Sequence, residues 1–434
     1  MFLKMASLNI SPDLHYECIR CGRSCGEFWE IPVTEEKAAE IRARPKEELR
    51  AAGDPGEPIV ESPWTPGQLV MRMREETCTM LTDKGLCSLH AAFGPESKPN
   101  ICRSFPYRFI ETPRGDTVGV SFACTAVLGS LGPAISTQRQ QLEELQAFTL
   151  SRRRIEGPPG LTGFIPTDWE QYEAIEEDLT ALLDPALGPL GQRLVSQSVY
   201  LQLLVKFLRE ARREADAELE GPEANEEPLA VFRRRMRGDE SGPWPLVRAL
   251  AAKRGPSPLL RRMILGFAHA LRNTYGERRG RLRSYVMVIA TYIAAAAGRG
   301  GIELPKLKHS TPYRRIGQIG FDPGREALDE LLTRYFRHRL FRKDLLLADT
   351  IQFGHHLLLL HWGLIHWYSA VFADNAGADQ IELEHLTEGL RNVEKFYVYH
   401  STLDNLFAKY PLLRGFLDRL FDHPLYAFSM GYAR

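Results

Sequence analysis

The sequence lacks cysteine over most of its length, because all seven cysteines of its 434 residues lie between positions 18 and 124. It also has no net charge, with 55 basic and 55 acidic residues. Proteins that bind nucleic acid usually carry a strongly basic surface, so this balance gives no reason to expect a nucleic-acid partner. Sulfur chemistry is therefore expected in one part of the chain, and the remainder folds without it.

Long apolar runs are scarce, and only two stretches are candidates for crossing a membrane. Residues 285–297 are too few, since a spanning helix needs about 20 residues. Residues 353–372 are numerous enough but include four imidazoles, which are costly inside a bilayer. We therefore expect two buried core helices and no membrane partner. The histidines are most simply core side chains with polar partners, and a cofactor or metal role is the alternative: His355, His356, His361 and His366.

A secretory leader is also missing from the sequence. Residues 1–13 contain neither an apolar stretch of the required length nor a small-residue cleavage site. We therefore expect a cytoplasmic protein, in which thiols stay reduced. In that setting, clustered cysteines favour metal binding or redox catalysis over disulfides. The odd number of cysteines also leaves one thiol over in a framework of disulfides alone.

The spacing of the cysteines is typical of a metal-binding loop. Thiolates are soft ligands that suit zinc or an iron–sulfur cluster, and either takes four cysteines when all of its ligands are thiolates. Seven thiols allow one centre with spare thiols, or two centres that include a non-cysteine ligand. His15 and His90 are the nearest candidates for that ligand. The predicted metal ligands are Cys18, Cys21, Cys25, Cys78, Cys87, Cys102 and Cys124.

The sequence predicts a mainly α protein, with an N-terminal loop-rich, cysteine-ligated metal domain packed on a large all-α C-terminal domain. Residues 14–125 are rich in Gly and Pro, with one helix expected after Thr34 and one short strand at 118–122. From about residue 133 the apolar spacing is helical, and alternating strand–helix units are absent. We expect domains at 1–130, 131–303 and 304–434, of which the last two can equally form one unit.

Three cysteine-bearing segments resemble the zinc/iron-chelating cysteine-cluster family. They are Tyr16-Glu-Cys18-x2-Cys21-Gly22-x2-Cys25, then Gly85-Leu86-Cys87-x-Leu89-His90, and then Lys98-Pro99-x2-Cys102-Arg103-x-Phe105-Pro106. The family pattern usually ends its first run with two adjacent cysteines, and Gly26 occupies the second of these places here. The order of the first run, with two and then three intervening residues, is the reverse of the common radical S-adenosylmethionine motif and does not indicate that class.

The whole chain is also similar to flagellin lysine N-methylases, which join such a cysteine region to a helical part. The matching segments are Cys25-Gly26-x2-Trp29-x-Ile31-Pro32-Val33, Tyr335-Phe336-x3-Leu340-Phe341 and Arg391-x-Val393-Glu394-Lys395. The family pattern has histidine where this chain has Lys395. The resemblance implies an iron–sulfur cluster, 4Fe–4S in the first instance, and S-adenosylmethionine as methyl donor. It also implies a protein substrate, namely surface lysines of flagellin or of another protein.

Lysine methylation requires a neutral amine, although the ordinary lysine pKa is about 10.4. A carboxylate or tyrosine can accept the proton. Arg391 and Glu394 lie three apart on a predicted helix, together with Tyr397, Tyr399 and His400, and can pair on one face. We name Arg391 and Glu394 as catalytic candidates, with an ordinary ion pair as the alternative.

A methyl-donor pocket is not apparent in the sequence, because no glycine-rich loop follows a strand in the manner of doubly wound methyltransferases. The alternative function is a metal-binding scaffold that recruits a protein partner and performs no chemistry. Zinc with four protein ligands would favour that alternative, since such sites are structural.

Overall fold

The computed structural model describes residues 8–26, 30–45, 49, 56–62, 65, 67–74, 77–149, 153–216, 226–237, 244–252, 255–274, 281–304, 307, 310–399 and 411–431. The chain forms two compact units, Met1–Glu156 and Gly157–Arg434. The first unit thus continues past the boundary expected at residue 130. The helices on either side of residue 303 belong to one unit, as the alternative division allowed.

The first unit contains a four-stranded sheet of order β1-β7-β6-β8. Its strands are β1 (Leu8–Ile10), β6 (Tyr107–Glu111), β7 (Asp116–Val120) and β8 (Arg153–Arg154). Strands β6 and β7 form an antiparallel hairpin in which Phe109 lies opposite Val118, and β1 runs parallel to β7. The strand expected at 118–122 is therefore present two residues earlier. Phe109, Val118 and Val120 are buried, so one face of the hairpin supplies the core of this unit.

Short elements carry the rest of the first unit, as its Gly- and Pro-rich sequence predicts. Thr34 caps α1 by accepting a hydrogen bond from the Lys37 amide, which confirms the expected helix start. The remaining elements are two small hairpins and several short helices: α1 (Glu35–Arg42), β2 (Ile59–Glu61), β3 (Leu69–Met71), β4 (Met73–Arg74), β5 (Thr77–Cys78), α3 (Ser88–Phe93), α4 (Asn100–Ser104), α5 (Thr125–Leu128) and α6 (Arg139–Phe148).

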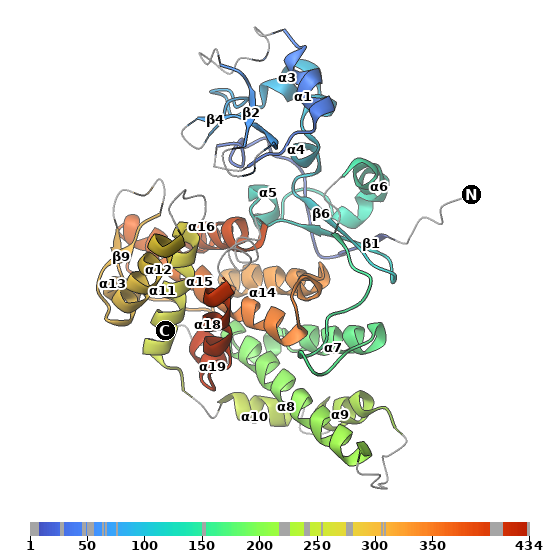
Figure 1. The fold of residues 1–434 in the computed structure, drawn as a ribbon, viewed down its shortest axis with the longest axis vertical. Helices are drawn as coiled ribbons and strands as arrows, with labels where there is room; N and C mark the ends of the chain where they lie inside the picture. Colours follow the sequence, from blue (N-terminus) through green and yellow to red (C-terminus); the bar gives the residue numbers. More distant parts are fainter. Residues whose placement is uncertain are drawn as a thin grey trace, which may run out of the picture. The chain divides into compact units, whose positions relative to one another are not determined.

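The second unit is almost entirely helical, and the mainly α prediction is confirmed (Figure 1). A two-residue pairing of β9 (Gly301–Ile302) with β10 (Thr311–Pro312) is the regular strand structure among its described residues. The main helices are α7 (Trp169–Ala181), α8 (Leu190–Asp216), α9 (Pro228–Arg237), α10 (Pro245–Ala252), α11 (Pro258–Thr274), α12 (Arg281–Ala296), α14 (Glu326–Phe341), α15 (Ile351–Asn375), α16 (Leu383–Val393), α18 (Pro411–Phe421) and α19 (Tyr426–Gly431).

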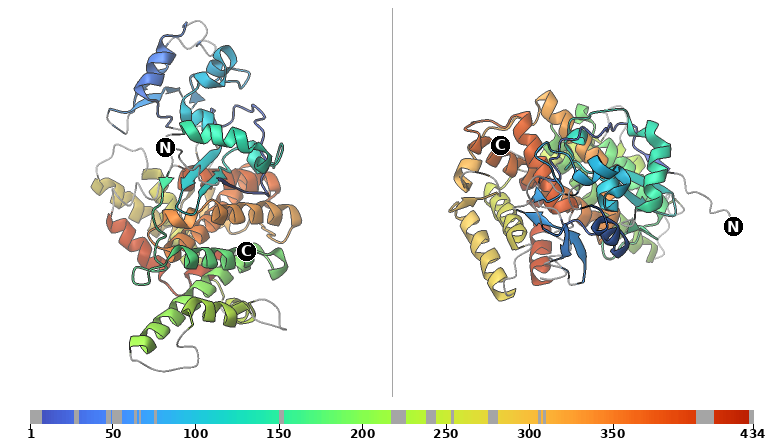
Figure 2. Two further views of the ribbon diagram at one scale, coloured as in Figure 1. Left: turned by 90° about the vertical axis from the view of Figure 1, so that its right-hand side faces the viewer. Right: turned by 90° about the horizontal axis from the view of Figure 1, so that it is seen from above.

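Helix α15 forms the core of the second unit. Most of its side chains are buried, and it packs against α16, α8, α11 and α19. The orange and red helices of this unit lie together in both views of Figure 2. The close approach to α16 depends on Gly389, since a Cβ there would lie 2.6 Å from the Ser369 backbone nitrogen. Within the described residues, no helix has both the length and the apolar character needed to cross a bilayer. The apolar stretch at 353–372 is therefore a buried core helix, as the sequence predicted. The same prediction was wrong for 285–297, because this stretch lies in α12 with Val286, Ile289 and Ile293 more than half exposed.

Candidate metal centre and buried charge network

The first cysteine run lies in a tight loop of the first unit. The amides of Cys25 and Gly26 both donate to the Gly22 carbonyl, at 3.0 and 2.9 Å. Gly22 has a φ of +64°, the region that glycine adopts without strain. Cys18 and Cys21 are exposed and Cys25 is partly buried. The loop therefore presents two of its thiols to solvent and turns the third inward.

The second cysteine segment packs directly against this loop. The Cys78 amide at the end of β5 donates to the Cys25 carbonyl at 2.8 Å. Cys87 precedes α3 and pairs with Leu81 in an isolated bridge. The two backbones meet at Gly22 and Gly85, where a Cβ on Gly22 would lie 2.9 Å from the Gly85 Cα and closer still to its carbonyl oxygen. Two segments far apart in the sequence thus share one hydrogen-bonded loop structure.

Four thiols are linked through their effects on one another's pKa, and we call them the Cys102 group: Cys25, Cys78, Cys87 and Cys102. Burial, followed by the neighbouring thiol Cys87, raises the pKa of Cys25 to about 11. Burial raises the pKa of Cys78 to about 12, with further contributions from Cys25 and Cys87. Burial also raises the pKa of Cys102 well above its usual value, with Cys25, Cys78 and Cys87 adding to the effect. Burial is the largest cause in all three cases, and the neighbouring thiols add to it.

The other three thiols form a second set, which we call the Cys124 group: Cys18, Cys21 and Cys124. The Cys21 sulfur donates to the Thr125 hydroxyl at 3.7 Å, which places it beside the first residue of α5. Burial raises the pKa of Cys124; the Val127 and Ala126 amides oppose this, and Cys21 and Cys18 reinforce it. The groups are neighbours, because Cys21 and Cys18 also contribute to the raised pKa of Cys25.

Tyr16 lies beside the Cys124 group. Burial raises the pKa of its phenol, and the next contributions come from Cys18 and Cys124. Its ring meets that of Tyr107 edge-to-face, with centroids 5.3 Å apart. Its amide donates to the Pro133 carbonyl at 3.1 Å, which ties the segment before Cys18 to the segment after α5. Although Tyr16 belongs to the motif noted in the sequence, its position beside two thiols could not be predicted from spacing.

The two histidines proposed as extra ligands lie in different surroundings. His15 directly precedes Tyr16, and its Nδ1 atom lies 3.4 Å from the Ser130 hydroxyl. His90 lies on α3, and burial together with Lys98 and Arg20 lowers its pKa. Lys98 also opposes the rise in the pKa of Cys25. The structure therefore separates the two candidates, and their ligand role stays a prediction.

The donor chemistry of the Cys102 group fits a thiolate-bound metal. Four sulfurs are the number that a structural zinc ion or a 4Fe–4S cluster requires. Burial makes each thiolate costly by itself, and a bound cation offsets that cost by pairing with the charge. In the described part of the chain, no three His, Cys, Asp or Glu side chains converge closely enough to hold an ion. The ligand assignment therefore stays a prediction.

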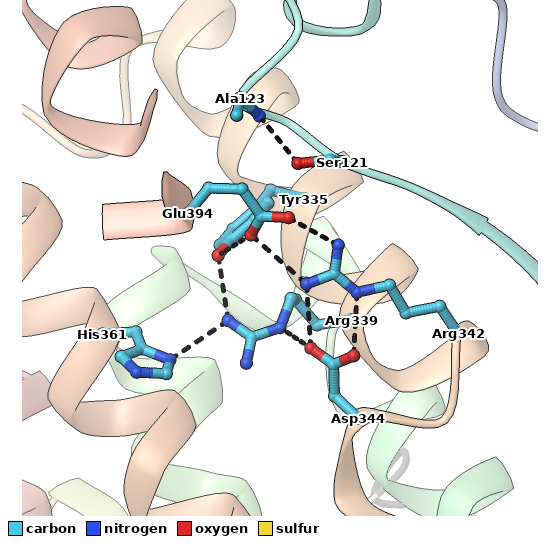
Figure 3. Close-up of polar contacts among 8 residues, drawn as sticks. All are labelled: Ser121, Ala123, Tyr335, Arg339, Arg342, Asp344, His361 and Glu394. Carbon is cyan, nitrogen blue, oxygen red and sulfur yellow. Dashed lines mark hydrogen bonds and ion pairs between the residues drawn. The ribbon is translucent and has the colours of Figure 1, made fainter. Parts of the chain in front are cut away.

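The catalytic candidate Glu394 lies in a buried charge network of the second unit (Figure 3). Arg342 donates to both Glu394 carboxylate oxygens, at 2.6 and 3.2 Å, and the Tyr335 hydroxyl donates to it at 3.0 Å. Arg342 also binds both oxygens of Asp344, at 2.8 and 2.9 Å, and Arg339 pairs with the same carboxylate. The two arginines and two carboxylates balance in charge.

Burial would raise the pKa of Glu394, but Arg342 and Arg339 outweigh it and lower that pKa below its usual value. Glu394 is therefore held as a carboxylate, at the point where α16 passes into a π-helical turn, Glu394–Tyr399. Its neighbour Arg391 is also buried. These contacts explain Glu394 as the acceptor of a structural network, and its catalytic role stays a prediction.

Of the two tyrosines expected near Glu394, the structure describes the side chain of Tyr397 but not that of Tyr399. Tyr397 is buried, and its hydroxyl lies 2.7 Å from that of Tyr368 and donates to the Ala268 carbonyl at 3.2 Å. The side chain of Tyr399 and all of His400 lie outside the described part of the chain. Arg339 and Arg342, which dominate the network, were not singled out from the sequence. They lie in a basic run with Arg337, His338 and Lys343, and nothing in that run distinguishes the two buried arginines.

The four histidines of α15 are buried and have core partners. His355 lies 3.1 Å from the Gln197 amide oxygen, and the Nδ1 atoms of His361 and His366 lie 3.1 and 3.2 Å from Arg339 and Arg261. Burial lowers the pKa of His355 to about 3 and of His356 to about 4. Both stay neutral at ordinary pH. These contacts match the prediction of core histidines.

The chain was compared with known proteins at three levels. It matches no protein-family model, no curated protein and no solved structure. The interpretation of its function therefore depends on the resemblances in the sequence and on the geometry described above.

Proposed function

We propose that the first unit binds a thiolate-held metal centre, an iron–sulfur cluster or zinc, through its cysteines. The observation that supports this most directly is the packing of the loop of Cys21 and Cys25 against the segment of Cys78 and Cys87, where the Cys78 amide donates to the Cys25 carbonyl at 2.8 Å. Cysteines that bind nothing gain no stability from being brought together, so packing alone does not explain this arrangement. A metal centre would explain it, because ligation crosslinks and stabilises segments that bury little apolar surface by themselves.

We further propose that the chain uses this centre in modifying a protein, by methyl transfer from S-adenosylmethionine to surface lysines. The resemblance to lysine N-methylases supports this reaction, and an iron–sulfur cluster would supply redox or electrophilic chemistry. The chain's own residues must then hold the lysine and remove its proton. Glu394 is the named candidate for the proton acceptor, although its bonds to Arg342 and Tyr335 must open before it can act.

One observation favours a second candidate function, a metal-binding scaffold that recruits a protein partner. Arg339, Arg342, Asp344 and Glu394 form a buried network of two positive and two negative side chains in the helical unit. Such a network rigidifies a core and does not need a substrate. In this alternative the first unit binds structural zinc, and the helical unit presents a surface to the partner.

The test is anaerobic purification of the full chain, followed by iron, sulfide and zinc analysis and a visible spectrum. We expect a brown protein with about four irons and four sulfides. The matched variant Cys102→Ser should lose that content and colour. Stoichiometric zinc in a colourless protein would contradict the methylase proposal and support the scaffold.

The second step is incubation with labelled S-adenosylmethionine and lysine-bearing candidate proteins, flagellin among them. Label on the substrate that depends on Cys102 would support the enzyme. No incorporation under either reducing or oxidising conditions, with a loaded cluster, would leave the scaffold as the better proposal.

A further inference from the structure

We propose that the second unit binds the phosphate group of a small phosphorylated molecule, in a cavity at the C-terminal end of α12 where three arginines converge. The cavity has a volume of about 690 Å³, which is usual for sites of small ligands. It lies in the part of the second unit labelled β9, α12 and α13 (Tyr313–Ile316) in Figure 1. The site uses no cysteine and does not depend on the proposed metal centre. The lining residues that matter here are Gly298, Arg299, Gly300, Glu303, Ser310 and Arg314.

The turn after α12 has a fixed shape, because two of its residues are glycines with a positive φ. Gly298 has a φ of +65° and Gly300 a φ of +79°. The Gly298 amide donates to the Ala295 carbonyl at 3.0 Å. The Arg299 amide donates to the Ala294 carbonyl at 2.8 Å. These bonds close the end of the helix in a way that glycine permits without strain, and they fix the backbone of Arg299 at the cavity.

Two more guanidinium groups lie close to this turn. A Cβ built on Gly298 would lie 3.6 Å from the Nε atom of Arg314 and 3.9 Å from the Nη1 atom of Arg262. The two side chains come from α13 and α11, and both thus approach within 4 Å of one point at the cavity. Among the described residues, the buried Nε atom of Arg262 has no hydrogen-bond partner. Like charges brought together in this way repel one another unless an anion lies between them.

The neighbouring carboxylates do not neutralise these arginines. Asp374 and Asp379 both pair with Arg315, the residue after Arg314, at 3.0 and 2.6 Å. Within the part of the chain that the structure describes, the three arginines of the cavity form no such ion pair. Glu303 also lines the cavity, so three positive side chains face one negative side chain there. The cavity therefore keeps a positive charge that favours an anionic ligand.

A phosphomonoester matches both the charge and the donor groups of the cavity. Its phosphate carries a charge of about −1.5 to −2 at neutral pH. The planar guanidinium group donates two parallel hydrogen bonds to phosphate, which makes arginine a specific partner for it. Ser310 supplies a neutral donor, since its hydroxyl oxygen would lie 2.8 Å from a Cβ on Gly301. Glu303 repels the phosphate, but it can accept a hydrogen bond from a hydroxyl group elsewhere on the ligand.

The alternative is that the arginines only stabilise the C-terminal end of α12. The helix dipole favours cations at that end. However, the Ala294 and Ala295 carbonyls already accept backbone amides, and no hydrogen bond of the described residues joins an arginine side chain of the cavity to the helix end. This alternative predicts a loss of stability when the arginines are removed, but no phosphate binding by the wild type.

The test is isothermal titration calorimetry of the full chain at constant ionic strength, with inorganic phosphate and phenyl phosphate as probes. We expect saturable binding by the wild type. Arg299→Ala and Arg314→Ala should each weaken it at least about tenfold, because each removes charge-assisted hydrogen bonds. Glu303→Gln should strengthen it, because a negative charge leaves the cavity. The matched control is Arg283→Ala, an exposed arginine near the other end of α12 and more than a Debye length away, which should keep the affinity within about twofold.

The two probes distinguish the sources of the phosphate group. Tighter binding of phenyl phosphate would support a phosphorylated molecule as the ligand, and equal binding would support the same site with free phosphate. No binding of either probe, or an equal loss in Arg283→Ala, would overturn the inference. Urea unfolding and circular dichroism of each variant establish that the fold is retained. A less stable Arg314→Ala, together with a wild type that binds no phosphate, would assign the arginines to the end of α12 instead.

Discussion

Replacing Glu394 with glutamine is the sharpest test of the buried charge network. Two arginines and two carboxylates balance there, so Glu394→Gln leaves one uncompensated positive charge among buried side chains. Removing one partner of a buried ion pair typically costs about 3–5 kcal/mol. Glutamine can still accept a hydrogen bond from Tyr335, so we expect the free energy of unfolding to fall by about 3 kcal/mol.

Urea unfolding followed by tryptophan fluorescence measures this loss, because Trp362 and Trp367 lie buried on α15. The matched control is Glu384→Gln, since Glu384 is 80% exposed on the neighbouring α16 and its loss should cost less than about 1 kcal/mol. The double variant Glu394→Gln with Arg342→Gln should recover part of the stability, because the uncompensated charge is removed as well.

The same variant separates a structural from a catalytic role for Glu394. If the network is structural, stability falls and the remaining folded protein keeps the proposed methyl-transfer activity. If Glu394→Gln is as stable as the wild type yet inactive, the reasoning from the network is refuted and Glu394 acts on the substrate.

Two further predictions concern acid stability and the cysteine loop. Burial holds the pKa of His355 at about 3 and that of His356 at about 4. Below about pH 6.5, the unfolded chain therefore binds protons at these histidines that the folded chain does not bind. The free energy of unfolding should drop between pH 7 and 5, by about 2 kcal/mol for each histidine. A urea titration at constant ionic strength measures the drop. Gly22→Ala should destabilise the first unit by more than about 1 kcal/mol, since the new Cβ meets the Gly85 backbone at a positive φ; metal affinity and near-ultraviolet circular dichroism report the change.

Each of these predictions has a control. His355→Gln should flatten the acid dependence by one histidine's share, and a stability that stays constant from pH 7 to 5 would contradict the burial argument. Gly67→Ala shares the positive φ of Gly22 but meets no atom within 4 Å, so it should cost less. Equal losses in the two glycine variants would show that the contact with Gly85 is unimportant.

The helical part of the fold could be predicted from local patterns. Asp168 starts α7 with a capping box closed by Gln171, and the apolar spacing of α15 identified a core helix because burial on all sides needs apolar residues on all sides. The domain boundary was harder to place. The helical pattern at α6 predicts the start of a helical domain, yet the structure places α6 in the first unit, where it packs against α4.

The candidate sites were predictable in composition but not in arrangement. The seven cysteines could be named from the sequence, whereas their positions relative to one another depend on non-local backbone contacts such as that between Cys25 and Cys78. Likewise, the spacing of Arg391 and Glu394 favoured a local pair. The structure shows Arg342, which lies on another segment, bound to both oxygens of Glu394, and spacing along the chain could not predict this donor.

The loop at Gly26 has room that its sequence does not use. A Cβ placed there would have ordinary contacts only, the nearest being the Arg23 and Gly22 carbonyl oxygens at 3.6 Å. The backbone would therefore accept a cysteine at 26 without rearrangement, in contrast to Gly22. The substitution Gly26→Cys would add a further thiol to this loop while the backbone stays the same. It is therefore a natural starting point for redesigning metal coordination in this unit.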